Sequence, residues 1–263
     1  MKTFVIIGLL ASISLISCQS KDGDYSFFSE EDDLELGKQM AAQIDADYAQ
    51  FPIVSRSQHP GLYQKLEKMR DQILKSNHIL HRDEFAWELK VIDNDTIHNA
   101  FCTPGGFIYI YTGLIRFVES ADELAGIMAH EIAHGDLRHS NDQMTKVYGI
   151  QVLSSIITGG EGKSLTNLGI NLLGLRFSRG DEAEADAMAV RYLNDTDFKP
   201  QAFGKFFERM DSLGGSMGPL QFLSTHPNPE NRVEKINLIW EQTGSKKGAN
   251  HTKLFSDLIK SLP

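Results

Sequence analysis

Cysteine is nearly absent from this 263-residue sequence, which contains only Cys18 and Cys102. If Cys18 carries a lipid, as argued below, Cys102 has no partner within the chain. The fold therefore does not depend on disulfides and must rest on a hydrophobic core. A chain of this length, with 41% hydrophobic residues, is long enough to bury one.

An excess of positive charge is also lacking. Asp and Glu number 35 against 26 Lys and Arg, which gives a formal net charge of −9. A chain with this balance has no electrostatic footprint for nucleic acid. The negative charge is better explained by solubility.

Long apolar runs are confined to the first residues. Lys2 precedes the apolar stretch 4–16, which is typical of a secretory signal and too short to span a bilayer. The stretch ends in Leu15-Ile16-Ser17-Cys18, which resembles the lipobox of bacterial lipoproteins. The resemblance implies a signal peptide over 1–17 and a diacylglycerol on the sulfur of Cys18. A plain signal peptide with an incidental cysteine is the alternative.

The residues after Cys18 predict where the chain is held. Residues 18–28 are short and polar, as expected of a lipidated tether. Gln19, and not Asp, follows the cysteine. By resemblance to known sorting rules, this favours an outer membrane, with the protein facing the periplasm of a bacterial cell envelope.

The mature chain predicts one α+β domain, predominantly helical with a small β-sheet, over residues 29–242. Ser29 and Asp32 form a capping pattern at the start of a helix. Residues 85–92 and 107–111 have the alternation or β-branched content of strands. Further helices are expected over 61–74, 121–137, 142–157, 181–194, 200–213 and 231–242, with another after Gly162. The tail 243–263 is expected to add one loosely attached helix.

The chemistry is concentrated in His130-Glu131-Ile132-Ala133-His134, an H-E-x-x-H pattern inside a predicted helix. Residues i and i+4 share a helix face, so both imidazoles can bind one metal ion. Glu131 lies about 100° around the helix and can reach a water on that metal. Hydrolysis needs this pairing, because zinc acidifies water and a carboxylate accepts its proton.

A third metal ligand is expected on a separate element, since a catalytic zinc takes about three protein ligands. Glu182 and Asp186 share a face of a later predicted helix, and Glu184 points elsewhere. One of the pair can bind the metal while the other orients a ligand histidine. The alternative is a solvated acidic helix face.

Several motifs in this order resemble the HtpX-like zinc endopeptidases, metallopeptidase family forty-eight, which includes the CAAX prenyl proteases. The resemblance is greatest to outer-membrane lipoprotein members involved in envelope protein quality control, and it covers about residues 29 to 240. It rests on H-E-x-x-H, on Ser178-Arg179 before E-x-x-x-D, on Asn99-Ala-Phe-x-x-Pro-Gly-Gly, and on Ser224-Thr225-His226-Pro227 followed by Arg232.

The resemblance implies a zincin fold with one Zn²⁺ per chain. It implies that His130, His134 and Glu182 bind the zinc, that Glu131 is the general base, and that Asp186 holds a ligand histidine. His226 would stabilise the oxyanion or regulate access, and Arg232 would support its loop. The implied reaction is hydrolysis of peptide bonds in unfolded or misassembled envelope proteins, with envelope assembly machinery as a possible partner.

The strand that begins at the Pro104 turn is the expected substrate site. Gly106, Phe107, Ile108 and Tyr109 would bind an extended polypeptide, because an open strand edge can pair with one. The alternative is an ordinary strand in the core.

Other interpretations remain at this stage. The chain could be a latent or non-proteolytic zinc-binding chaperone, or a structural lipoprotein with a chance motif. An intact Glu131 argues against a pure metal-binding module, which has no need of it. His139 is expected to be structural or on the surface, His98 a loop residue without a role, and Cys102 a small packed residue.

Overall fold

The computed structural model describes residues 27–159, 176–212, 221–227 and 231–263. The expected signal peptide, Cys18 and most of the tether lie outside the described residues, as does the helix expected directly after Gly162.

The helices and strands follow one another along the chain in this order: α1 Glu30–Ala46, α2 Pro60–Ile73, β1 Glu88–Ile92, β2 Ala100–Thr103, η1 Pro104–Gly106, β3 Phe107–Tyr111, α3 Thr112–Phe117, α4 Ala121–Asp136, α5 His139–Tyr148, α6 Ile150–Ile157, α8 Arg179–Asn194, α9 Ala202–Ser212, α10 Gln221–Thr225, α11 Arg232–Gln242 and α12 Thr252–Ile259.

The predicted start of α1 is confirmed. The Ser29 hydroxyl accepts from the Asp32 backbone N–H at 3.1 Å, and the Asp32 carboxylate accepts from the Ser29 N–H at 2.9 Å. These two bonds satisfy backbone donors that an uncapped helix leaves unpaired. Leu36, Met40 and Ile44 form the buried face of the helix.

The three strands form one sheet in the order β1-β3-β2, with β3 parallel to β1 and antiparallel to β2. The expectation that the strand at Phe107–Tyr111 offers an open edge is therefore wrong, because β3 is the central strand and is paired on both sides. The sequence pattern does not predict the pairing of β3 with β2, because β2 is too short to show an alternation of its own.

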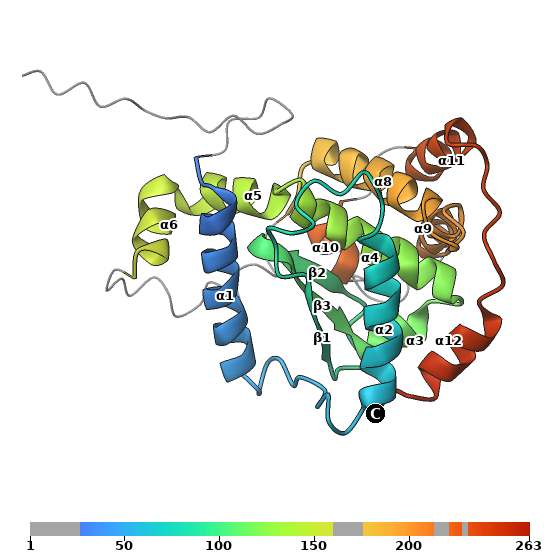
Figure 1. The fold of residues 1–263 in the computed structure, drawn as a ribbon, viewed down its shortest axis with the longest axis horizontal. Helices are drawn as coiled ribbons and strands as arrows, with labels where there is room; N and C mark the ends of the chain where they lie inside the picture. The colour runs from blue at the N-terminus through green and yellow to red at the C-terminus, as the bar shows by residue number, and fades with distance from the viewer. Residues whose placement is uncertain (1–26, 160–175, 213–220, 228–230) are drawn as a thin grey trace, which may run out of the picture.

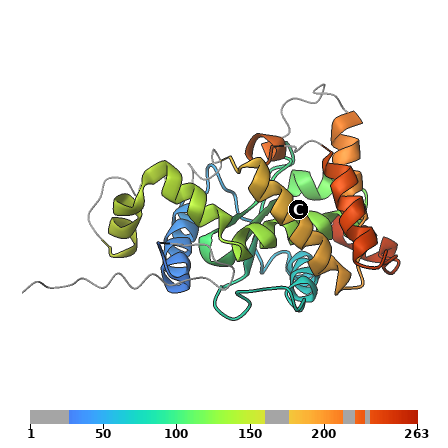
Figure 2. The same ribbon diagram turned by 90° about the horizontal axis from the view of Figure 1, so that it is seen from above.

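Both faces of the sheet are covered, which is why β3 is wholly buried. One face packs against α1 in a smaller core, and the other packs against α2 and α4 in a larger one. Figure 1 shows α1 on one side of the sheet and α2 and α4 on the other. Figure 2 shows α8, α9 and α11 together on the side away from α1. The fold is predominantly helical with a small sheet, as expected.

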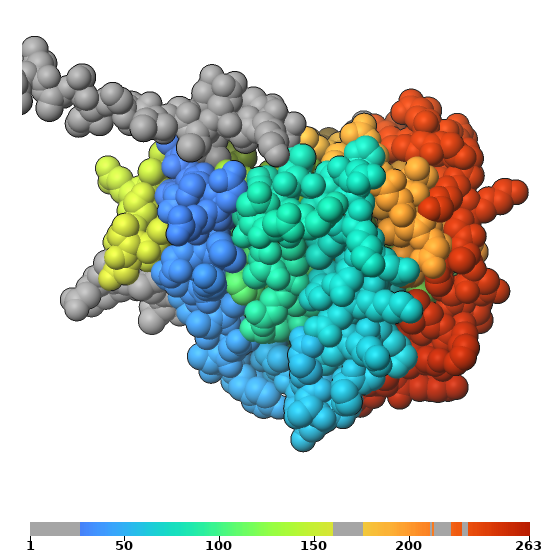
Figure 3. Space-filling model, viewed as in Figure 1, coloured from blue at the N-terminus to red at the C-terminus, as the bar shows by residue number. Residues whose placement is uncertain are grey.

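The helix expected over 142–157 is in fact two helices that begin earlier, at His139. Gly149 breaks them with a φ of 78°, a left-handed conformation that glycine adopts without steric cost. α6 packs beside α1, as Figure 3 shows at the edge of the molecule. Only part of this segment is core, because Leu153 and Ile156 are buried while Val147 and Ile150 are exposed.

The tail packs more firmly than the sequence suggested. Leu258 of α12 is 1% exposed and belongs to the larger core. Lys246 donates to the Asn194 carbonyl at 2.8 Å, and His251 Nδ1 lies 2.9 Å from Asp122 Oδ1. Among the described residues, no helix is both long and apolar enough to cross a membrane.

Candidate metal centre and active site

The H-E-x-x-H residues lie at the centre of the molecule on α4. The helix begins after Ser120, whose hydroxyl accepts from the Glu123 N–H at 3.1 Å, and every residue of α4 is buried. His130 and His134 are one turn apart, and their Nε2 atoms lie 3.0 Å from each other. His130 and His134 therefore lie on one face of α4, as the sequence predicts.

The third candidate ligand comes from α8, which packs along α4. A capping box of Ser178 and Asp181 fixes the start of α8 at Arg179, which places Glu182 in the first turn of the helix. The Glu182 carboxylate oxygens lie 3.5 Å from His130 Nε2 and 3.4 Å from His134 Nε2. The packing of α8 against α4 therefore brings Glu182 next to histidines that lie about 50 positions earlier in the sequence.

His226 completes the cluster from the loop after α10. Its Nδ1 lies 3.0 Å from Glu182 Oε1 and 3.3 Å from His130 Nε2, and its Nε2 lies 3.5 Å from Glu131 Oε1. The Phe222 ring stacks on its imidazole with 4.4 Å between centroids. His226 therefore contacts both the ligand group and the candidate base.

These residues fit a divalent transition metal. One ligand atom from each of His130, His134, Glu182 and His226 lies within 4.8 Å of the others, and all four side chains are buried. The contacts of 3.0 to 3.5 Å given above are close to the edge of a tetrahedron with zinc–ligand bonds of about 2.1 Å, which is roughly 3.4 Å. Several unprotonated ring nitrogens meeting at one buried point would repel without a cation between them.

The protonation states of His130, His134 and Glu182 suit metal binding, since a ligand imidazole must be neutral and a ligand carboxylate ionised. Burial lowers the pKa of His134 to about 3 and lowers the pKa of His130 well below its usual value. Burial alone would raise the pKa of Glu182, but the neighbouring His226, His134 and His130 hold it well below its ordinary range.

Glu131 lies beside this cluster and is not one of its four residues. It is buried, and desolvation raises the pKa of its carboxyl to about 7. The backbone N–H of Cys102 on β2 donates to the same carboxylate. The sheet thus fixes the direction in which Glu131 points. The Cys102 thiol is itself buried, and burial raises its pKa well above the usual value, which agrees with a packed residue.

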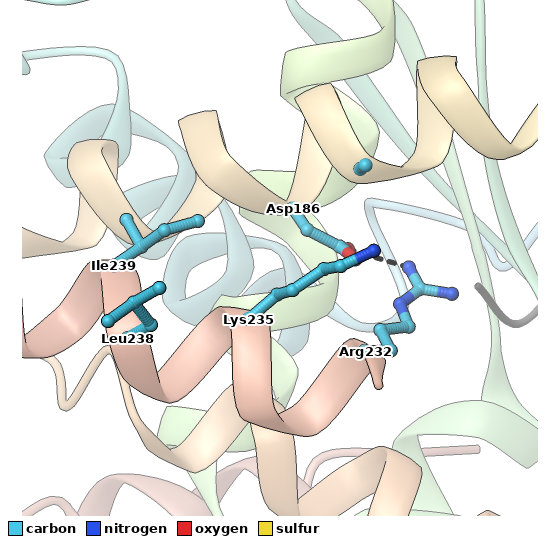
Figure 4. Close-up of a pocket in the computed structure, with 6 residues that line it drawn as sticks. Asp186, Arg232, Lys235, Leu238 and Ile239 are labelled. Atoms are coloured by element: carbon cyan, nitrogen blue, oxygen red, sulfur yellow. Dashed lines mark hydrogen bonds and ion pairs between the residues drawn. The ribbon is translucent and has the colours of Figure 1, made fainter. Parts of the chain in front are cut away.

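Asp186 lies behind the ligand group, as expected from its spacing. Its Oδ1 is 3.0 Å from His130 Nδ1 and accepts a 2.7 Å hydrogen bond from Arg232. Behind this pair, a cavity of about 140 Å³ opens between α8 and α11. Figure 4 shows Asp186 and Arg232 together at one end of the lining residues, with Lys235, Leu238 and Ile239 further along α11. The cavity is therefore lined by Asp186 and Arg232 and not by the four residues of the cluster.

His139 is the contact that the sequence reasoning missed. The sequence predicts a structural or surface residue, and His139 is in fact buried, with its Nδ1 3.0 Å from Nδ1 of His134. No spacing rule for a straight helix could have found it, because α4 ends before it.

The outer edge of the sheet beside α4 belongs to β2. The Cys102 carbonyl accepts from the Ser140 hydroxyl at 2.8 Å, and the His98 carbonyl accepts from the Phe222 N–H at 3.3 Å. α10 therefore lies against the chain that leads into β2. The predicted substrate residues Gly106, Phe107, Ile108 and Tyr109 are all buried in η1 and β3 and do not line this edge.

Comparison with known proteins agrees with this geometry. The profile described as Peptidase family M48 matches residues 62–239. Mitochondrial metalloendopeptidase OMA1 of Schizosaccharomyces pombe is 36% identical over 160 residues, which are 58% of this chain and 46% of that protein. OMA1 of Saccharomyces cerevisiae is 30% identical over 188 residues, 66% of this chain and 54% of its own length. The β-barrel assembly-enhancing protease of Escherichia coli K12 is 32% identical over 157 residues, 54% of this chain and 32% of its own length.

The chain thus corresponds to about half, or less, of the length of these relatives. The matched profile nevertheless covers most of the chain and includes His130, Glu131, His134, Glu182 and His226. This chain belongs to peptidase family M48, a family of metallopeptidases.

Proposed function

We propose that this protein is a zinc-dependent endopeptidase that hydrolyses unfolded or misassembled proteins of the cell envelope. The observation that carries the proposal is one buried cluster of His130, His134, Glu182 and His226, with Glu131 on the same helix as two of the ligands. The family membership supports the same reaction class.

In the proposed mechanism His130, His134 and Glu182 hold one Zn²⁺ per chain. When bound there, zinc supplies a Lewis acid that polarises the scissile carbonyl and acidifies water. Glu131 accepts a proton from the attacking water and returns it to the leaving amine. Its raised pKa of about 7 and its hydrogen bond from Cys102 suit this task, because the carboxylate is basic and held in place.

The outer edge of β2 replaces β3 as the proposed substrate strand. β2 runs beside α4, and its Cys102 N–H already touches the Glu131 carboxylate. An extended polypeptide paired along this edge would bring its backbone next to the base. Such a substrate must displace the contact between His98 and Phe222 and, where it pairs with the Cys102 carbonyl, the hydrogen bond from Ser140.

His226 makes the described state a closed one. His226 lies beside Glu182 and His130, so it would occupy the fourth position of a zinc ion held by the other three residues, which water or substrate needs. The residues of α10 lie on the approach to the β2 edge as well. Opening of this segment would therefore free the metal position and the substrate edge together.

The proposed location is the bacterial envelope, with a lipid on Cys18 and the domain in the periplasm at the outer membrane. The lipobox-like Leu15-Ile16-Ser17-Cys18 supports the anchor. The similarity to a protease named for enhancing β-barrel assembly supports envelope substrates and contact with assembly machinery. Replacing Cys18 by Ala should move the full chain from the membrane fraction to the soluble fraction. Continued membrane attachment would contradict the anchor.

The position of His226 within the cluster also favours a second function. If His226 never leaves the metal, the protein would act as a non-proteolytic zinc-binding chaperone or assembly factor. The two proposals differ in whether zinc-loaded protein cuts an unfolded chain.

One experiment separates these possibilities. Zinc content is measured for the full chain and for Glu131→Gln, together with cleavage of casein as an unfolded probe. We expect about one zinc in both proteins and cleavage only in the wild type. Zinc without cleavage in the wild type would favour the chaperone, and well-folded protein without zinc would overturn both.

A further inference from the structure

His139 lies beside His134 because the chain turns sharply after α4. In a continuous helix a residue five positions on would point about 140° away from His134. Here α4 ends at Asp136, and Arg138 adopts a left-handed conformation with a φ of 61°. α5 then begins at His139 and carries its ring back toward the ligand group.

The turn is held by the N-terminal helix. Arg138 Nε donates to Asp33 Oδ2 at 2.6 Å, and its Nη2 donates to the Ser29 carbonyl at 3.1 Å. Asn141 also donates to the Asp33 carboxylate. A left-handed conformation is unfavourable for a non-glycine residue, so it persists only where such contacts hold it.

The contact between the two histidines assigns their protons. Nε2 of His134 faces the ligand cluster, 3.0 Å from Nε2 of His130 and 3.4 Å from Glu182 Oε1. A ring that uses Nε2 for a metal keeps its proton on Nδ1. This Nδ1–H lies 3.0 Å from His139 Nδ1, which must therefore be the acceptor. The proton of His139 is then on Nε2, which lies 3.6 Å from Glu184 Oε2.

Each of the two proposed ligand histidines therefore has its own partner at Nδ1. Asp186 is 3.0 Å from the Nδ1 of His130, and His139 is 3.0 Å from the Nδ1 of His134. Groups that accept this hydrogen bond fix the ring orientation and the basicity of a ligand histidine.

We propose that His139 is a positioning residue that accepts the Nδ1–H of His134 and so sets the tautomer and direction of this ligand. The proposal rests on the metal site proposed above. It extends the site to α5 and, through Arg138 and Asp33, to the N-terminal helix α1.

The test compares His139→Leu with His139→Asn in the full chain. Leu has a similar volume without an acceptor, whereas the Asn side-chain oxygen can take the place of Nδ1. Zinc dissociation constants are measured by chelator competition at fixed pH, and the cobalt-substituted proteins are compared by their visible absorption bands. His78→Leu, which removes an exposed histidine, is the matched control. Metal-free unfolding shows that each variant is folded, and His139→Ala replaces the Leu variant if that one does not fold.

We expect the Leu variant to bind zinc about 10- to 100-fold more weakly and to show altered cobalt bands. The Asn variant and the control should stay within a few-fold of the wild type. Equal weakening in Leu and Asn, or none in Leu, would overturn the positioning role. Loss of zinc binding already in the wild type would instead overturn the proposed metal site.

Discussion

Arg232 and Asp186 form a buried ion pair directly behind the proposed metal ligands, with 2.7 Å between Nη2 and Oδ1. The same nitrogen lies 3.1 Å from Oε2 of Glu182, and the guanidinium lies 3.7 Å from the centroid of the Phe207 ring. One arginine from α11 therefore faces two carboxylates of α8. The candidate third ligand and the support of His130 both depend on its charge.

Replacing Arg232 by Met should destabilise the metal-free protein by about 3–5 kcal/mol, because two buried carboxylates lose their cation. Urea unfolding in the presence of a chelator measures this change. Arg56→Met is the matched control, since its pair with Glu67 is exposed and its loss should cost less than about 1 kcal/mol. Similar effects of the two substitutions would mean that the buried pair is not structural.

Replacing His226 by Ala should raise the cleavage of casein while zinc stays bound. The three other proposed ligands would remain, and the fourth position would be free for water. A rise of roughly tenfold corresponds to about 1.4 kcal/mol of closing free energy. Cleavage rates and zinc content are measured together. A lower rate with zinc still bound would instead indicate that His226 stabilises the oxyanion, which is the other role implied by the family resemblance.

Asp33 should make folding stability depend on pH in the weakly acidic range. Desolvation raises the pKa of its carboxyl from 3.8 to about 6, although Arg138 and Asn141 act to lower it. The folded protein then binds this proton more tightly than the unfolded chain. The contribution to stability is present below pH 3.8 and is lost as the pH rises through 6, by at most about 3 kcal/mol.

Asp33→Asn isolates this titration from those of other groups. The variant cannot titrate at this position, so the pH dependence of the difference in stability reports the Asp33 titration alone. We expect the stability of the wild type minus that of the variant to fall between pH 4 and pH 6 in urea unfolding. A difference that rises over this interval would mean that the ion pair lowers the carboxyl pKa in the folded state.

Gly126 should be the least replaceable small residue between α4 and α9. A Cβ there would lie 2.6 Å from Cβ of Phe203, whose ring is 5.6 Å from that of His130. Gly126→Ala should destabilise by about 1–3 kcal/mol through overpacking. Gly204→Ala is the control, because its Cβ would meet Ile236 at an ordinary 3.6 Å and the helix should gain up to about 1 kcal/mol. Thermal unfolding compares them, and equal melting temperatures would refute the close approach.

Local chemistry was readable from the sequence where it depends on residues a few positions apart. The cap at Ser29, the shared face of His130 and His134, and the i, i+4 pair of Glu182 and Asp186 follow from helix geometry alone. The expectation that these histidines and Glu182 converge is met by the ligand distances. The family resemblance, and not periodicity, supplied His226 and Arg232.

Tertiary structure decided what depends on strand order and on chain turns. A run such as Phe107–Tyr111 has the same sequence pattern as an edge or a central strand, and only its pairing with β1 and β2 made it central. The position of His139 depends on a left-handed Arg138, which is tolerated because Asp33, more than 100 residues earlier, binds its guanidinium. A sequence determines which side chains a helix presents on one face. The long-range packing of helices and strands decides which of them meet.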